Sequence, residues 1–204
     1  MGEGIVKNVT RPLQHLNTGL PLIYAGRMKS PKNFYLVRWA KPGDYRQLLD
    51  LSAEEASIIY GIDRRKAMRK YLEEYGREPY MTREGIRRSI SDYRRRRPRD
   101  FIIVVEKYPD RRIVGFVHAR AYRKSAYLND IVIDLRESKR GLGSLLVHAL
   151  EEAIVEACPV VEKIVTDAHP GSMKFFERYG YRVVDERVGR DGIVWYRMEK
   201  EIGR

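Results

Sequence analysis

The sequence predicts a single α/β domain in which helices flank a mixed, mostly antiparallel central sheet, with an N-terminal arm before it. Three observations support this fold class. The 204 residues match the usual size of one domain. Hydrophobic residues make up 43% of the chain, which is enough to bury a core and too much for a disordered chain. β-prone runs and segments of helical periodicity follow one another, and short turns join two pairs of those runs into antiparallel hairpins.

The chain divides at about residue 33. Residues 1–33 contain Pro12, Pro21 and Pro31, several glycines and only one apolar stretch, at 22–25. This composition predicts an extended, loosely packed arm. We assign residues 34–204 to the α/β domain.

Strand and helix signals recur in the first half of the domain. The run 34–39 predicts a strand, and the turn after it ends in Asp44, which we expect to cap a helix carrying Leu48 and Leu51. Start and stop signals predict further helices at 64–75 and 83–93. The segment 60–100 carries 14 basic and 7 acidic residues, so this fifth of the chain holds more than half of the net charge of +12.

The second half begins with strands and ends with a hairpin. We expect strands at 101–106, 113–122 and 127–134, a helix at 142–157, a strand at 163–167, a helix at 172–179 and a closing hairpin of 181–188 with 193–199. The helix at 142–157 is indicated by an uninterrupted apolar stripe at i, i+3 and i+4 spacing, which is typical of a helix packed on a sheet.

Composition also bounds the setting and the partners. A net charge of +12 favours anionic partners without naming one. Cys158 is the only cysteine, which excludes an internal disulfide framework and a multi-cysteine metal site and fits a reducing compartment. No apolar run approaches the roughly 18 residues that span a membrane. We therefore expect a cytoplasmic protein that binds neither a membrane nor a metal; an oligomer stays open.

The segment most informative about chemistry joins the strand at 127–134 to the helix at 142–157. A basic loop with Lys139 and Arg140 leads to Gly141 and Gly143, which open the helix. Glycines let backbone N–H groups approach an anion, and the first helical turn offers unpaired donors and a positive dipole end. This pattern predicts a phosphate or pyrophosphate site. The alternative is that the glycines only permit close helix packing.

Four segments in this order resemble the GNAT superfamily of N-acetyltransferases, over most of residues 34–202. The family's loop, Gln/Arg-x-x-Gly-x-Gly/Ala, corresponds to Ser138–Gly143 here, and its motif Asn-x-x-Ala-x-x-Phe-Tyr-Glu-Lys-x-Gly-Phe is similar to His169–Tyr181. The strands at 113–117 and 131–134 resemble the two strands before the loop, and the run 36–40 with Asp44 resembles the opening strand and helix cap.

The resemblance implies a donor, a reaction and a set of binding residues. The donor is acetyl-CoA, its pyrophosphate held by the backbone of 139–144 and its pantetheine arm along 131–133. The reaction is direct transfer of the acetyl group to an amine acceptor, a small molecule or a protein, in a ternary complex. The implied donor-binding residues are Ile131, Val132, Ile133, Ser138, Lys139, Arg140, Gly141, Leu142, Gly143 and Ser144.

The catalytic acid and base are less well defined. Phe176 stands where the family often has a tyrosine that protonates the departing thiolate, so we consider Tyr179, three residues further along the helix. Asp130 and His169 are the candidate bases for the acceptor amine, and His118 is a third. Each has a structural alternative: a core aromatic for Tyr179, a solvated strand carboxylate for Asp130, and a helix-start histidine bonded to backbone for His169.

Two other functions stay open. The phenylalanine at 176 allows a non-catalytic acyl-CoA-binding module. The basic segment 64–99 allows association with nucleic acid or an acidic acceptor, or it is a solvated surface.

Overall fold

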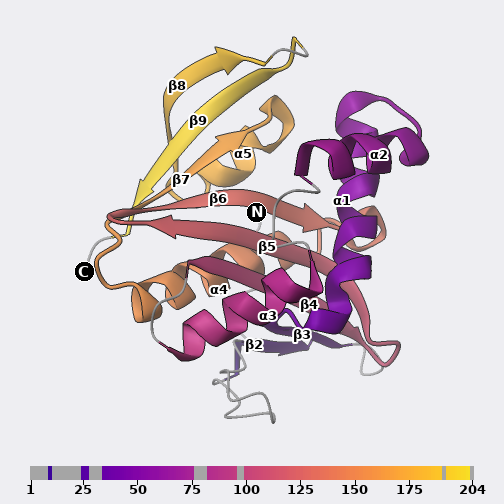
Figure 1. The fold of residues 1–204 in the computed structure, drawn as a ribbon. Helices are drawn as coiled ribbons and strands as arrows, with labels where there is room; N and C mark the ends of the chain where they lie inside the picture. Colours follow the sequence, from indigo (N-terminus) through magenta and orange to yellow (C-terminus); the bar gives the residue numbers. More distant parts are fainter. Residues whose placement is uncertain are drawn as a thin grey trace.

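A nine-stranded sheet runs through the computed structural model of the protein, which describes residues 9–10, 24–27, 34–75, 82–95, 99–189 and 192–202 (Figure 1). In spatial order the strands are β1 (Val9–Thr10), β2 (Tyr24–Arg27), β3 (Phe34–Trp39), β4 (Asp100–Tyr108), β5 (Arg112–Tyr122), β6 (Ser125–Ile133), β7 (Lys163–Ala168), β9 (Val194–Glu201) and β8 (Arg182–Val188). Among these described strands only β6 and β7 run parallel, so the predicted mixed, mostly antiparallel sheet is confirmed.

Helices cover both faces of the sheet (Figure 1). They are α1 (Tyr45–Tyr60), α2 (Arg64–Tyr75), α3 (Arg83–Arg94), α4 (Leu142–Ala157) and α5 (Pro170–Glu177), with short 3-10 helices η1 (Pro42–Asp44) and η3 (Leu135–Glu137). The predicted helix at 172–179 begins two residues early, because His169 caps it and Pro170 occupies the first turn, where a missing N–H costs nothing. β6 also begins two residues early, since Ser125 pairs with Tyr122 across a two-residue turn.

Two clusters of buried apolar residues lie on opposite faces. The first contains the α4 stripe, including Leu146 and Leu150, packed on residues of β3 to β6. The second contains Leu48 of α1 and Phe116 of β5. α3 crosses the end of the sheet where β3 ends and β4 begins, because it contributes Ile86 to the second cluster while its Tyr93 packs on Trp39 of the first at 4.5 Å between ring centroids.

The structure bears on two expectations near the start of the domain: the N-terminal arm and the helix cap at Asp44. The strands at 9–10 and 24–27 are extended, as expected for the arm, but they are paired into the sheet beside β3. The other residues of 1–33 lie outside the described residues, so the division at residue 33 stays a prediction. Asp44 occupies the N-cap position of α1 but makes no cap bond with it. Its carboxylate instead accepts from Arg38 and from the Lys41 backbone N–H, both at 2.7 Å, so the expected cap was wrong.

β6 and β7 separate part of the way along the sheet. They are in register only from Ser125 to Leu128 of β6, paired with Lys163 to Thr166 of β7. Next to the point of separation, β6 carries a bulge: His118 pairs with Asp130 and Ala119 with Leu128, so Asn129 is the extra residue. A bulge bends its strand and increases the local twist. The remainder of β6, up to Ile133, therefore has one edge that β7 does not cover.

In the part of the chain that the structure describes, the search for a helix long and apolar enough to cross a bilayer found none.

Candidate active site

The loop between β6 and α4 has the backbone shape of an anion site. Lys139 has a φ of 58° and Gly141 a φ of 78°, so left-handed residues alternate with right-handed or extended ones. Such alternation turns successive backbone N–H groups toward one concave side, and the unpaired N–H groups of the first helical turn add to it. A Cβ at Gly143 would lie 3.1 Å from the ring of Phe175, so this glycine also lets α5 approach α4 closely. Both roles of the glycines, anion cradle and close packing, fit the structure.

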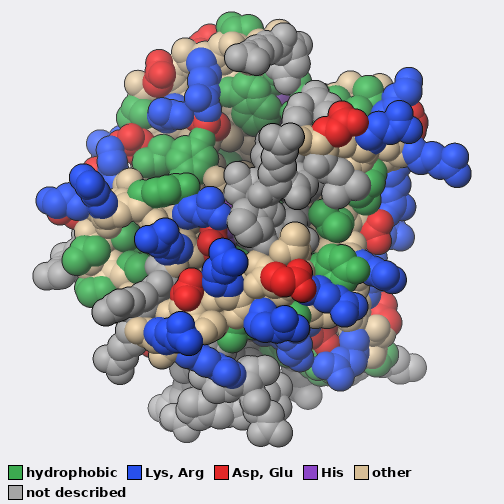
Figure 2. Space-filling view, viewed as in Figure 1, with side chains coloured by type: hydrophobic (Ala, Val, Ile, Leu, Met, Phe, Trp, Pro, Cys, Tyr) green, Lys and Arg blue, Asp and Glu red, His purple; other side chains and the backbone are tan. Residues whose placement is uncertain are grey.

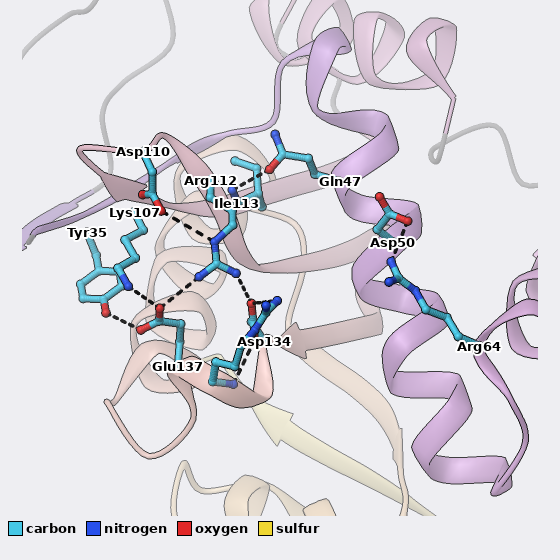
Figure 3. Close-up of polar contacts among 11 residues, drawn as sticks. Tyr35, Gln47, Asp50, Arg64, Lys107, Asp110, Arg112, Ile113, Asp134 and Glu137 are labelled. Carbon is cyan, nitrogen blue, oxygen red and sulfur yellow. Dashed lines mark hydrogen bonds and ion pairs between the residues drawn. The ribbon is translucent and has the colours of Figure 1, made fainter.

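A buried carboxylate ties this loop to the sheet (Figure 3). Glu137 is 3% exposed at its side chain and accepts from the Tyr35 hydroxyl at 2.7 Å and from Lys107 Nζ at 2.5 Å. Arg112 Nη2 donates to it at 3.2 Å, and Arg140 Nε lies 3.3 Å from its other oxygen. Burial alone would raise the pKa of Glu137, but the hydrogen bonds from Lys107 and Tyr35 lower it below its ordinary value. The charge of Arg140 is therefore partly balanced by Glu137.

A second buried carboxylate fixes the start of the loop. Asp134 accepts from Nε and Nη2 of Arg136, both at 2.9 Å, and also from Arg112 on the neighbouring strand. Burial acts to raise the pKa of Asp134, but these arginines and the Arg136 backbone N–H lower it to about 2. Arg112 contacts both Asp134 and Glu137, so one arginine of β5 holds both ends of η3 (Figure 3). These contacts could not be predicted from the sequence, because the partners of the two carboxylates lie in β3, β4 and β5.

A cavity of about 240 Å³ lies beside the separated part of β6. Its walls come from α1, the end of β6 with η3, and the start of α5; they are formed by Leu51, Glu54, Glu55, Ile58, Ile59, Val132, Ile133, Asp134, Leu135, His169, Gly171 and Ser172. The cavity is mostly apolar, with carboxylates and one imidazole around it. This composition is typical of a small-molecule site.

Glu55 is the cavity residue whose acidity is most altered. Burial, together with the negative charge of Asp130, raises the pKa of Glu55 from 4.5 to about 8. Glu55 is not among the catalytic residues predicted from the sequence. One signal was present: Glu55 follows Leu48 by seven residues and Leu51 by four, so it lies on the same side of α1 as these two buried leucines. A carboxylate on the buried side of a helix is unusual and marks a candidate proton acceptor.

Asp130, a predicted base, belongs to a row of polar side chains on three strands, centred on His118. His118 is fully buried, its Nε2 lies 3.1 Å from Asp100 Oδ1, and its Nδ1 lies 3.6 Å from Asp130 Oδ2 and 3.2 Å from Asn129 Nδ2. Burial acts to lower the pKa of His118, but hydrogen bonds and charge from the two aspartates raise it above its ordinary value. Asp130 therefore lies beside a buried histidine and also acts on Glu55 through its negative charge; its side chain is 16% exposed.

His169, the second predicted base, lines the cavity from the start of α5. Its Nδ1 accepts from the Gly171 backbone N–H at 3.1 Å, and its ring lies edge-on to Trp195 with centroids 6.0 Å apart. Because Nδ1 is an acceptor, a neutral imidazole carries its proton on Nε2. The ring therefore offers a hydrogen-bond donor to the cavity, and the lone pair a base would use is occupied.

Tyr179 lies elsewhere, at the first turn of α4. Its hydroxyl is hydrogen-bonded to the Ser144 hydroxyl, and its ring packs on Phe175 at 5.0 Å between centroids. Phe176 is buried in the core against Tyr181, so it does not face the cavity. Of the three predicted catalytic residues, only His169 lines the cavity; Asp130 lies beside His118, and Tyr179 lies at the loop.

The predicted donor-binding residues lie in two places: the end of β6 and the loop before α4. Ile131 and Ile133 pack against the cluster that contains α4, whereas Val132 is buried in the cluster that contains α1; Val132 and Ile133 both line the cavity. The backbone of these residues forms the strand edge that β7 does not cover. The loop residues Ser138–Ser144 follow after Asp134 and η3, so the ten residues lie in two segments between the cavity and the start of α4.

Comparisons with known proteins found a matching family model and several solved structures of similar fold. The family model described as acetyltransferase (GNAT) domain matches residues 65–202. Among solved structures, the chain is similar to PaiA N-acetyltransferase from Thermoplasma acidophilum in complex with coenzyme A, with TM-score 0.62 and 15% identity over 82% of this chain and 98% of that one. It is also similar to an aminoglycoside 6'-N-acetyltransferase complexed with coenzyme A, with TM-score 0.57 and 16% identity over 82% and 97%.

A further similar structure is Ard1 from Thermoplasma volcanium, with TM-score 0.56 and 14% identity over 83% of this chain and 99% of that one. At these identities the structures establish a shared fold. A comparison with curated protein sequences found no match. The family model covers more than half of the chain; the loop, the separated strands, α4 and α5 lie in the matched part, whereas α1 precedes it. The chain therefore belongs to the GNAT acetyltransferase family.

Proposed function

We propose that the protein is an acetyl-CoA-dependent N-acetyltransferase that passes the acetyl group directly to an amine acceptor. The observation that carries this proposal is the uncovered edge of β6, which has an anion-shaped loop at its end and a cavity with a high-pKa carboxylate beside it. Two structures of similar fold are complexes with coenzyme A, which supports the choice of donor.

Donor binding relies mainly on backbone groups. The N–H groups of residues 139–144 hold the pyrophosphate, and the free edge of 131–133 pairs with the amides of the pantetheine arm. The side chains of Lys139 and Arg140 add attraction, although Glu137 reduces the contribution of Arg140. Since geometry comes from backbone, the serine at 138 is compatible with donor binding where the family has Gln or Arg.

Acceptor activation requires the loss of a proton from an ammonium group. Glu55 is the base we propose, because it lines the cavity and its pKa of about 8 lies close to neutral pH. The neutral amine then attacks the thioester carbon, the carbon–sulfur bond breaks, and the sulfur leaves as a thiolate. The nitrogen gives up its second proton as the amide forms, the thiolate takes up one proton to become free CoA, and Glu55 releases the proton it accepted to solvent. Asp130 takes a supporting role, since its charge raises the proton affinity of Glu55.

Two side chains are proposed as hydrogen donors. The Nε2–H of His169 is available to a carbonyl oxygen in the cavity, because its Nδ1 is held by Gly171. Tyr179 is the second: its hydroxyl and that of Ser144 stand together at the start of α4, at the pyrophosphate end of the donor path, so we assign it a hydrogen bond to the donor there and not the protonation of the thiolate. The proposal needs no covalent intermediate on the protein.

Titration calorimetry with acetyl-CoA and a thiol-release assay on an amine panel test the proposal. Gly141→Val should abolish donor binding, since a β-branched residue is strained at a φ of 78° and fills the anion cradle. Gly192→Val is the matched control: its φ is 79° and nothing lies within 4 Å of its added Cβ. Undiminished binding by the Gly141 variant would overturn the donor site. Binding without thiol release from any amine would identify an acyl-CoA-binding module instead.

A further inference from the structure

A second and larger cavity lies at the other end of β6. Its volume is about 930 Å³, and its walls come from α3, the start of β4 and the β5–β6 hairpin; they are formed by Gly85, Arg88, Asp92, Arg99, Asp100, Arg120, Ala121, Tyr122, Arg123, Lys124 and Ser125. Ser125 borders this cavity and Ile133 borders the cavity of about 240 Å³ described above, so about 26 Å of strand β6 separates the two cavities. The larger cavity is a site of its own.

Its lining is strongly basic. Five cationic side chains face two carboxylates, and Asp100 is already bonded to Arg120 at 2.8 Å. Lys124 pairs outward with Glu162, also at 2.8 Å. The other three arginines, at 88, 99 and 123, are exposed, and within the described ranges no carboxylate lies within ion-pair distance of them. Figure 2 shows many Lys and Arg side chains over the lower part of the visible face, where α3 lies in Figure 1.

The hairpin sequence is poorly suited to its turn. Arg123 and Lys124 form the two-residue connection between β5 and β6, and Arg123 has a φ of 46°. Glycine, asparagine and aspartate are the residues that favour such a position. Backbone strain of this kind is typically retained where it serves a function. Here it places two cations at the rim of the cavity.

An aromatic side chain accompanies these cations. Tyr122 is 54% exposed, lines the cavity and directly precedes Arg123. Arginines supply forked donors for phosphate oxygens, and an exposed aromatic ring beside them supplies a stacking surface for a base. Phosphate and a flat ring together are the chemistry of a nucleotide.

We propose that this cavity binds a nucleotide, either free or as part of a single-stranded nucleic acid. Arg88, Arg99 and Arg123 contact its phosphates, and Tyr122 stacks on its base. The proposal does not depend on acetyl transfer. Of the basic segment 64–99, it assigns binding roles to Arg88 and Arg99 alone, and it adds residues of the β5–β6 hairpin to them.

Fluorescence polarisation with labelled single-stranded RNA and with labelled ATP tests the site. Arg99→Glu/Arg123→Glu should weaken binding roughly tenfold or more. Arg65→Glu/Arg182→Glu is the matched control, because both arginines are exposed, on α2 and β8, and the change in net charge is the same. Three phosphate contacts give a salt slope of about 2 log units per log unit of salt, and the double variant should retain about 0.7.

Arg123→Gly separates binding from folding. Glycine relieves the positive φ, so the variant should melt at a higher temperature than the parent while its affinity for the probe falls. Tyr122→Ala should weaken RNA or ATP binding and leave inorganic polyphosphate binding unchanged. Tighter binding of the RNA probe would identify single-stranded nucleic acid as the ligand, and tighter binding of ATP would identify a free nucleotide. Equal loss in both double variants, no binding, or insensitivity to Tyr122→Ala overturns the proposal.

Discussion

Glu55→Gln is expected to remove a pH-dependent part of catalysis. With a pKa of about 8, Glu55 is about 9% ionised at pH 7 and about 91% ionised at pH 9, so the base form increases about tenfold over this interval. A general base contributes roughly 10²–10⁴ in rate. The glutamine variant, which cannot accept the proton, should lose about that factor in kcat/KM at pH 9 and about tenfold less at pH 7.

Initial rates of thiol release, measured from pH 6 to 10 with one amine, provide the test. The acceptor also titrates, so the informative quantity is the ratio of wild-type to variant kcat/KM at each pH. This ratio should rise about tenfold between pH 7 and 9 and then level off, since the acceptor contributes equally to both proteins. A ratio that stays constant across the range would refute Glu55 as the base.

Thermal melting of the same pair distinguishes catalysis from folding. The folded pKa of Glu55 lies above its ordinary value of 4.5, so ionisation opposes folding, and this destabilisation grows as the pH rises from about 4.5 to about 8. Glu55→Gln should therefore melt at a higher temperature than the wild type at pH 9, with a smaller difference at pH 5. A variant that is both less active and less stable at pH 9 would contradict this account.

Three further predictions concern the buried polar groups. Asp134→Asn weakens the contact of this side chain with Arg112 and should lower the free energy of unfolding by about 2–4 kcal/mol, measured by urea titration at pH 7. Since the pKa of Asp134 in the folded protein is about 2, the stability difference between wild type and variant should disappear as the pH falls from about 4 toward 2. Tyr35→Phe removes one hydrogen bond to Glu137 and should cost about 1 kcal/mol in the same titration, with weaker acetyl-CoA binding by calorimetry. His118→Gln should flatten the melting temperature against pH, because the raised histidine pKa stabilises the fold below pH 6.5 and this contribution is lost as the pH rises through the folded value.

Local patterns were sufficient for the helices and strands predicted from residue 34 onward, but not for β1 and β2, which were expected only as an extended arm. The stripe that predicted a helix at 142–157 is α4, with the predicted bounds, because a continuous apolar face has one way to pack on a sheet. Gly141 and Gly143 likewise lie at the start of that helix, where a positive φ and a close neighbour require them. Such features depend on residues near in the sequence.

Side-chain partners across the sheet were beyond the reach of the sequence. Glu137 accepts from Tyr35, 102 residues away, and Glu55 owes its pKa to the cavity and to Asp130 on another element. The bulge at Asn129, which sets the register of His118, depends on pairing between strands rather than on composition. The sequence also suggested that Lys139 and Arg140 both attract an anion, whereas the charge of Arg140 is partly balanced by the buried carboxylate of Glu137.

The short ladder between β6 and β7 has a consequence for the motions of the protein. It contains four residue pairs, against eight between β5 and β6 and six between β7 and β9, so the sheet consists of two larger halves joined by a narrow seam. Cooperative units of a protein open separately where few hydrogen bonds join them. Hydrogen exchange should therefore show the amides of this seam exchanging faster than those of the ladders on either side, and slower once acetyl-CoA bridges the two halves.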